Sequence, residues 1–164
     1  MTVAIDEIYE KYLQKAITEI NALGDEVAQA GAGTRIPVVG SGHPLGDVFL
    51  LKYEPRASEL QEGVAFFGRA GNALLKSLQR LRVDPMAVYG TNCLKFADGD
   101  EEESRPFLSR ELGPTEGELQ TFTPTIDAFF TPDIDDSLDD QPAKTRFWNA
   151  FKLLGEWWAS LPPY

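Results

Sequence analysis

The sequence contains very little cysteine and histidine. Cys93 is the only cysteine and His43 the only histidine among the 164 residues. A single cysteine excludes an internal disulfide framework, and it excludes a zinc or iron–sulfur centre held by several cysteines of the chain. We therefore expect no metal ion and no cofactor. His43 lies directly before a predicted strand, and we interpret it as a structural residue.

Basic residues are scarce relative to acidic ones, and long apolar runs are missing. The 15 Lys and Arg against 26 Asp and Glu give a formal net charge of −11. This charge excludes a basic coat over the whole surface, although it leaves room for a local basic cleft. No apolar run reaches the roughly 18 residues of a membrane span, and the N-terminus does not resemble a signal peptide. We expect a soluble, cytoplasmic monomer that contacts no membrane.

The remaining composition is that of an ordinary globular protein, with 43% hydrophobic and 25% charged residues. We expect one domain over residues 1–164. Apolar side chains at helical spacing predict a first helix over residues 5–20, which ends near Gly24 and packs its apolar stripe against a core. Binding of a partner by this stripe is the alternative. Leu74, Leu75, Leu78 and Leu81 form the expected inner face of a second helix.

Three short apolar runs predict strands, and they alternate with helical segments. The runs are residues 48–51, 87–89 and 126–130. The first run shows no polar alternation, which suits a strand of a parallel sheet that is buried on both faces. A short helix is expected over residues 106–112, and Pro142 is expected to begin the last helix. The four aromatic residues clustered in that helix are expected in the core, namely Phe147, Trp148, Trp157 and Trp158. The alternation predicts an α/β fold, a three-layer αβα arrangement around a short, mostly parallel sheet.

Three motifs in order carry a resemblance to a known family. They are the segment from Gly42 to Arg56, the sequence Ala-Phe-Phe-Gly-Arg-Ala-Gly at residues 65–71, and Thr-Asn-Cys-Leu-Lys-Phe at residues 91–96. Together they resemble the uracil-DNA glycosylase superfamily, most closely the class that usually carries an iron–sulfur cluster. The resemblance covers about residues 42–112. It implies hydrolysis of the N-glycosidic bond of a uracil flipped out of DNA, as in base-excision repair.

The resemblance also implies the roles of several residues. Phe66 would stack on the uracil ring, and Asn92 would present a donor and an acceptor to the O4 and N3–H edge of the base. Gly68 would let backbone amides approach the ligand. The residues implied to bind DNA phosphates are Arg69, Lys76 and Lys95. Taken alone, Phe66 fits a core position equally well, and Asn92 is typical of a turn or a cap.

Departures from the family pattern concern the catalytic positions. Tyr53 stands where the family has an acid, Glu54 follows one place later, and Glu59 matches another acidic position of the same loop. Thr131-Pro132-Asp133 replaces the late His-Pro-Ser motif. We therefore place Tyr53, Glu54, Glu59 and Asp133 around the reaction centre, and we expect weakened catalysis, because a tyrosine supplies no negative charge near neutral pH.

Further departures concern the cluster and the length of the sheet. The cluster cysteines are missing, and Cys93 occupies an apolar position of the family, which predicts a buried thiol. A strand and a helix that the family has after Leu112 also have no counterpart. The alternative is a catalytically inactive module of the same fold that binds a nucleobase, DNA or a protein. The acidic segments 98–103 and 133–140 favour a protein partner or merely solubility.

Overall fold

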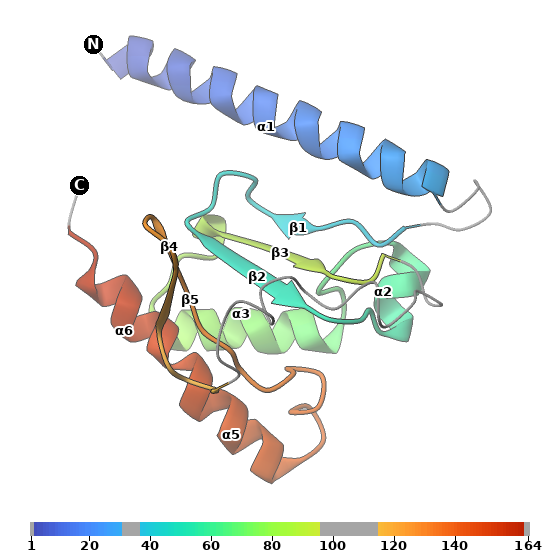
Figure 1. Cartoon of the computed structure of the whole chain (residues 1–164), viewed down its shortest axis with the longest axis vertical. Helices are drawn as coiled ribbons and strands as arrows, with labels where there is room; N and C mark the ends of the chain where they lie inside the picture. Colours follow the sequence, from blue (N-terminus) through green and yellow to red (C-terminus); the bar gives the residue numbers. More distant parts are fainter. Residues whose placement is uncertain (1, 31–36, 96–114, 163–164) are drawn as a thin grey trace. The chain divides into compact units, whose positions relative to one another are not determined.

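A computed structural model of the chain describes residues 2–30, 37–95 and 115–162. These residues divide into two compact units, of which unit 1 comprises Met1–Phe66 and Met86–Asp100, and unit 2 comprises Phe67–Pro85 and Glu101–Tyr164. The described elements in chain order (Figure 1) are α1 (Thr2–Ala30), β1 (Ser41–Gly42), β2 (Val48–Lys52), α2 (Ala57–Glu62), α3 (Arg69–Leu81), a 3-10 turn (Pro85–Ala87), β3 (Val88–Asn92), β4 (Gln120–Thr123), β5 (Ile126–Ala128), α5 (Gln141–Phe151) and α6 (Leu153–Ser160).

Unit 1 contains a three-stranded mixed sheet with the strand order β1-β3-β2. Strand β2 pairs in parallel with β3, and β1 pairs antiparallel with the other edge of β3. The parallel register places Lys52 opposite Asn92 at the carboxyl ends of the two strands. The pairing continues beyond these ends, because the Cys93 amide donates to the Lys52 carbonyl at 2.8 Å. Side chains from both strands therefore meet at one edge of the sheet.

The first two predicted strands are confirmed, and their parallel pairing is as expected. Burial of the first strand on both faces is wrong, since Phe49 is 60% exposed and Leu51 is 38% exposed. Burial alternates along β2, and Phe49 and Leu51 lie on its more exposed face. A run without polar residues therefore does not require a strand to be fully buried.

The third predicted strand does not join this sheet. Residues 126–128 form β5, which pairs antiparallel with β4 in a separate two-stranded sheet of unit 2. The third strand of the mixed sheet is β1, a segment whose glycines and proline indicate a turn in the sequence. Apolar content predicted a strand at residues 126–130, but it carries no information about the partner of that strand.

The first helix is confirmed but is longer than predicted. Helix α1 continues past Gly24 to Ala30, because a single glycine inside a helix costs only about 1 kcal/mol. Its apolar stripe does not pack into a core. Ile5 and Tyr12 are exposed by 66% and 64%, and the later members of the stripe are half-buried, namely Leu13, Ala16, Ile17 and Ile20. Helical periodicity identifies the apolar face of a helix, but not what covers that face.

Unit 2 combines the two-stranded sheet with helices α3, α5 and α6. On α3, Leu74 and Leu78 are buried, but Leu75 is 46% exposed, so its predicted place on the inner face is wrong. The last helical segment begins at Gln141 with Pro142 in its first turn, as predicted, and Asp140 caps it by accepting from the Ala143 amide. The other buried apolar residues of this unit are Ala70, Val83, Ile134, Phe147, Ala150, Phe151 and Leu154.

The predicted last helix is divided at Lys152 into α5 and α6. Of the four clustered aromatic residues expected in the core, only Phe147 is buried, whereas Trp148, Trp157 and Trp158 are half-buried.

The predicted helix at 106–112 lies outside the described residues, as does the acidic segment 98–103. Among the described helices, none combines the length and the apolar character needed to cross a membrane. The described helices and strands form a mixed α/β fold with a small three-stranded sheet.

Candidate functional site

A buried ion pair lies at the carboxyl end of the parallel strands of unit 1. Lys52, the last residue of β2, pairs through its Nζ with Oε1 of Glu59 on α2, and their side chains are 4% and 1% exposed. The same Oε1 accepts from the Arg56 amide at 3.1 Å and so caps α2. Figure 1 shows α2 beyond the ends of β2 and β3. Buried charges persist when they are paired and fully hydrogen-bonded, and this pair meets that condition.

The second oxygen of Glu59 joins the two residues predicted to bind the base. Oε2 accepts from the Phe66 amide at 2.7 Å and from Asn92 Nδ2 at 3.2 Å. The structure therefore brings Phe66 and Asn92 to one carboxylate, although they lie 26 residues apart in the sequence. Four donors surround the two Glu59 oxygens, and this arrangement gives Glu59 a positioning role.

The backbone and the ring of Phe66 are both constrained. Its φ of 58° lies in the left-handed region, which is rare for a bulky residue and typical of ligand-binding and strained positions. Its ring lies against Gly90 of β3, where an added Cβ would come within 2.6 Å of the ring. Lys52 Nζ lies 5.4 Å from the ring centroid, within the range of a cation–π contact. These contacts hold the ring at the edge of the sheet.

Asn92 carries a polar atom without a partner. The residue is 1% exposed, and its Oδ1 is buried and has no hydrogen-bond partner in the described part of the chain. The amide cannot be flipped to relieve this, because Oδ1 would then face the Glu59 carboxylate. Leaving a buried acceptor unsatisfied costs about 1–3 kcal/mol. The free acceptor, together with the second hydrogen of Nδ2, can hydrogen-bond to a ligand that presents one donor and one acceptor.

The other predicted catalytic residues are distributed over both units. Tyr53 is half-buried and Glu54 is exposed, and both follow β2 in unit 1. Asp133 belongs to unit 2, where its Oδ1 accepts from the Asp135 amide at 2.7 Å. The structure thus groups Tyr53, Glu54 and Glu59 at the end of one strand, whereas Asp133 belongs to the other unit.

The residues predicted to contact DNA differ in their environments. Arg69 forms a two-pronged hydrogen bond to Asp139, at 2.7 and 3.1 Å, and this bond holds the pKa of the Asp139 carboxyl below its usual range. Lys76 is exposed on α3. Lys95 donates to the Thr91 hydroxyl, and burial lowers the pKa of its ammonium. Gly68 caps α3 with a φ of 92°, a conformation that favours glycine.

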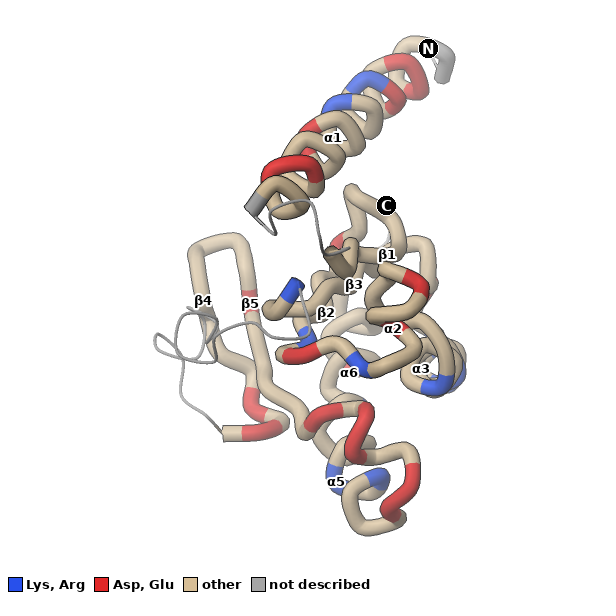
Figure 2. Tube along the Cα trace, turned by 90° about the vertical axis from the view of Figure 1, so that its right-hand side faces the viewer, with Lys and Arg blue, Asp and Glu red and all other residues tan. Residues whose placement is uncertain are grey.

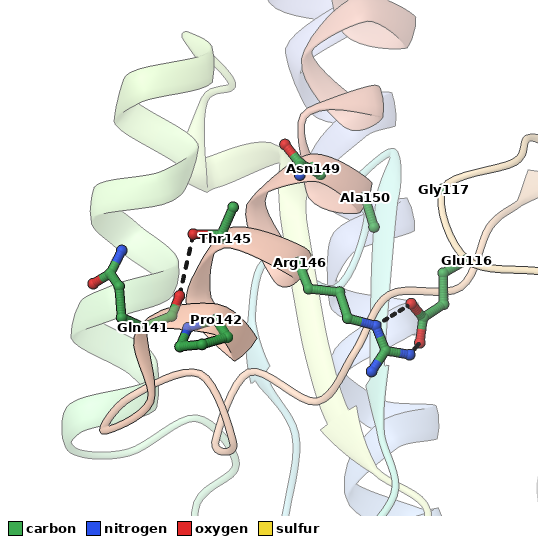
Figure 3. Close-up of a pocket in the computed structure, with 8 residues that line it drawn as sticks. All are labelled: Glu116, Gly117, Gln141, Pro142, Thr145, Arg146, Asn149 and Ala150. Carbon is green, nitrogen blue, oxygen red and sulfur yellow. Dashed lines mark hydrogen bonds and ion pairs between the residues drawn. The ribbon is translucent and has the colours of Figure 1, made fainter.

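Two cavities lie within unit 2. The larger has a volume of about 670 Å³ and is lined by residues of α5 and by Glu116 and Gly117 (Figure 3). Its arginine, Arg146, is already paired with Glu116 through two bonds of 2.6 and 2.9 Å. This cavity therefore offers a ligand no unneutralised arginine. The smaller cavity lies between α3 and α5.

Sequence reasoning overlooked Lys52 and Gly90. Lys52 was available as a signal, because it continues the buried register of Val48 along β2 and thereby places an ammonium group on a buried position. A buried lysine requires an acidic partner, and Glu59 is near in sequence. Gly90 interrupts the apolar run of β3, and a glycine inside a strand often marks the close approach of another group. Here that group is the Phe66 ring.

Cys93 follows Asn92 and is half-buried, so the predicted burial of its thiol is only partly met. Burial raises the pKa of the Cys93 thiol, and the nearby Lys95 ammonium partly opposes this rise.

Because only the thiolate is nucleophilic, we expect alkylation of Cys93 by iodoacetamide to require a higher pH in the folded protein than in the urea-unfolded chain. Mass spectrometry across a pH series measures both midpoints. A folded-state midpoint equal to or below the unfolded one would contradict this expectation.

Comparisons of the sequence with protein families and with curated proteins found no relative. No protein-family model matches the chain, and no curated protein matches it in sequence. The interpretation of the site therefore depends on its geometry and on the three motifs.

Proposed function

We propose that this protein recognises a uracil base flipped out of DNA and hydrolyses its N-glycosidic bond slowly. The observation that carries the proposal is the buried, unpartnered Oδ1 of Asn92, which lies beside Phe66 through their shared contact with Glu59. A nucleobase supplies both a flat face for an aromatic ring and an edge of donors and acceptors. Enzymes that act on flipped bases use such stacking and edge reading.

The hydrogen-bonding pattern of Asn92 favours uracil over cytosine. Its Oδ1 can accept from the N3–H group of uracil, while the second hydrogen of Nδ2 can donate to O4. Cytosine presents an acceptor at N3 and an amino donor at position 4, which is the opposite pattern. The orientation of the amide is held by Glu59, so a rotation that would suit cytosine is disfavoured.

Slow hydrolysis follows from the state of the carboxylates in unit 1. A general base must reach a water molecule through a free oxygen, but both Glu59 oxygens already accept hydrogen bonds from protein donors. Glu54 is exposed, and Tyr53 carries no charge near neutral pH. Glu54 is therefore the carboxylate of this loop that remains to orient water.

The same proposal includes the layers of the fold, the cellular location and the oligomeric state. We propose that helices cover both faces of the sheet in the three-layer αβα arrangement of the superfamily, and that the protein acts as a cytoplasmic monomer on uracil-containing DNA. The mixed three-stranded sheet supports an α/β relationship of this kind. Exposed Phe49 and Leu51 on one face of β2 are compatible with a thinner layer there.

Uracil release from a single-stranded oligonucleotide tests the proposal. We expect measurable release by the wild-type protein, no cytosine release from a matched oligonucleotide, and about 100-fold less uracil release by Asn92→Ala, because two hydrogen bonds to the base are lost. Calorimetric binding of free uracil by both proteins separates recognition from hydrolysis. Far-UV circular dichroism verifies that the variant is folded.

Three outcomes have distinct meanings. Uracil binding without release would assign the protein to the inactive nucleobase-binding module, which the four donors around Glu59 favour as the second candidate. Release unaffected by Asn92→Ala would remove the proposed reader. Absence of both binding and release would overturn the nucleobase function as a whole.

A further inference from the structure

The smaller cavity of unit 2 differs in charge from the acidic chain around it. It has a volume of about 470 Å³ and is lined by residues of α3, of α5 and of the segment before α5. Among its described lining residues none is acidic, whereas four are basic, namely Arg69, Lys76, Arg80 and Lys144. The whole chain carries 26 acidic and 15 basic residues. The charged side chains that line this groove are therefore all cationic, which favours an anionic ligand.

Two of these cations are not neutralised by the protein. Arg69 is paired with Asp139, but the side chains of Lys76 and Lys144 are exposed and form no ion pair with any residue that the structure describes. Figure 2 shows basic positions on both α3 and α5. On α3, Asn72 lies one turn before Lys76, and its exposed amide adds a neutral donor to the same wall.

The third cation lies over an aromatic ring. The Arg80 guanidinium carbon is 4.1 Å from the centroid of the Trp148 ring, within the range of a cation–π contact. Arg80 lies one helical turn after Lys76 on α3. Aromatic rings and stacked arginines are the surfaces on which unpaired bases stack in proteins that bind single strands. The groove thus combines two free ammonium groups with one planar platform.

We propose that this groove binds single-stranded DNA, with Lys76 and Lys144 contacting backbone phosphates and the Arg80–Trp148 pair supporting a base. The inference deepens the proposed function and rests on it for the choice of DNA, because an extruded uracil arrives on a DNA strand. The combination of phosphate contacts with a stacking platform favours a single strand over a duplex, whose bases stack on each other. A polyanion such as DNA can bind a chain with a net charge of −11 only at a local basic site of this kind.

Binding of oligothymidylate by fluorescence anisotropy tests the groove. This probe contains no uracil, so its binding does not depend on the Asn92 site. We compare the wild-type protein with Lys76→Gln/Lys144→Gln and with the control Lys11→Gln/Lys15→Gln. Both pairs are exposed helical lysines, and both substitutions change the net charge equally. Loss of two phosphate contacts makes the fall of log K with log salt less steep by about 1.4. At 0.1 M salt this change corresponds to a roughly 25-fold lower affinity.

The expected result is this loss for the groove variant and wild-type binding for the control. Equal binding by both variants, or no binding of oligothymidylate by the wild-type protein, would overturn the groove while leaving the uracil measurements unaffected. Binding of inorganic phosphate in the absence of oligothymidylate binding would also overturn it, since the anion would then not be a nucleic acid. Conversely, loss of binding in the groove variant stands even where no uracil is released.

Discussion

Replacing Glu59 with glutamine is expected to destabilise the protein by about 3–5 kcal/mol. The substitution keeps the shape of the side chain but leaves the buried Lys52 ammonium without its counter-charge, and removing one partner of a buried pair carries a cost of this size. The Gln amide would also turn one donor toward other donors, because Lys52, Phe66 and Asn92 all donate to Glu59. Small domains are stable by only about 5–15 kcal/mol, so the effect is large.

Urea unfolding followed by far-UV circular dichroism measures this loss. All three tryptophans, at 148, 157 and 158, belong to α5 and α6 of unit 2, so their fluorescence reports on unit 2. Hydrogen exchange of the β3 amides reports on unit 1, where the loss is expected. Glu62→Gln is the matched control, because Glu62 is exposed on the same helix, and surface substitutions usually stay within about 0.5 kcal/mol.

A double variant distinguishes the ion pair from a general sensitivity of the position. Lys52→Met/Glu59→Gln removes both charges, and buried pairs replaced by neutral groups are often close to neutral in stability. We expect this variant to be more stable than Glu59→Gln alone. A cost of Glu59→Gln as small as that of Glu62→Gln would show that the pair contributes little. We also measure Lys52→Met alone. If the cost of the double variant equals the sum of the costs of Lys52→Met and Glu59→Gln, the two charges are not coupled.

The proximity of Phe66 and Asn92 could be predicted from the sequence, but the way in which they are held together could not. Two apolar runs indicated neighbouring parallel strands, and parallel strands bring their carboxyl ends to one edge of a sheet. Asn92 lies at that edge, opposite Lys52. The carboxylate that joins Asn92 to Phe66 is a tertiary contact between α2, β3 and a loop, and no local pattern specifies it.

Pairing between strands was the weaker part of the sequence interpretation. The alternation of apolar and polar residues reports how one strand is covered, not which strand lies next to it. Two residues of β1 complete the mixed sheet, whereas the longer apolar run at 126–130 forms a hairpin with β4. Likewise, the stripe on α1 defines a face, but its exposure depends on partners that the sequence of one helix does not identify.

The close approach of Gly90 to Phe66 leads to the second large effect. In Gly90→Ala the new Cβ would lie 2.6 and 2.7 Å from two atoms of the Phe66 ring, and Leu50 lies 3.7 Å away on the other strand. Real Cβ atoms essentially never approach so closely, so the ring must move. Its movement is restricted, because the Phe66 amide is bonded to Glu59 and the backbone of Phe66 is already left-handed.

We expect Gly90→Ala to cost about 1–3 kcal/mol, as overpacking of a buried site does, and to weaken uracil binding at least about tenfold, a loss of about 1.4 kcal/mol. Urea unfolding and calorimetry with free uracil measure the two effects. Gly24→Ala is the control, because nothing lies within 4 Å of a Cβ at that position of α1. Alanine is the better helix former, so the control is expected to gain up to about 1 kcal/mol. If Gly90→Ala binds uracil as the wild-type protein does, the position of the Phe66 ring does not determine base binding, and stacking on Phe66 is no longer a tenable part of the recognition site.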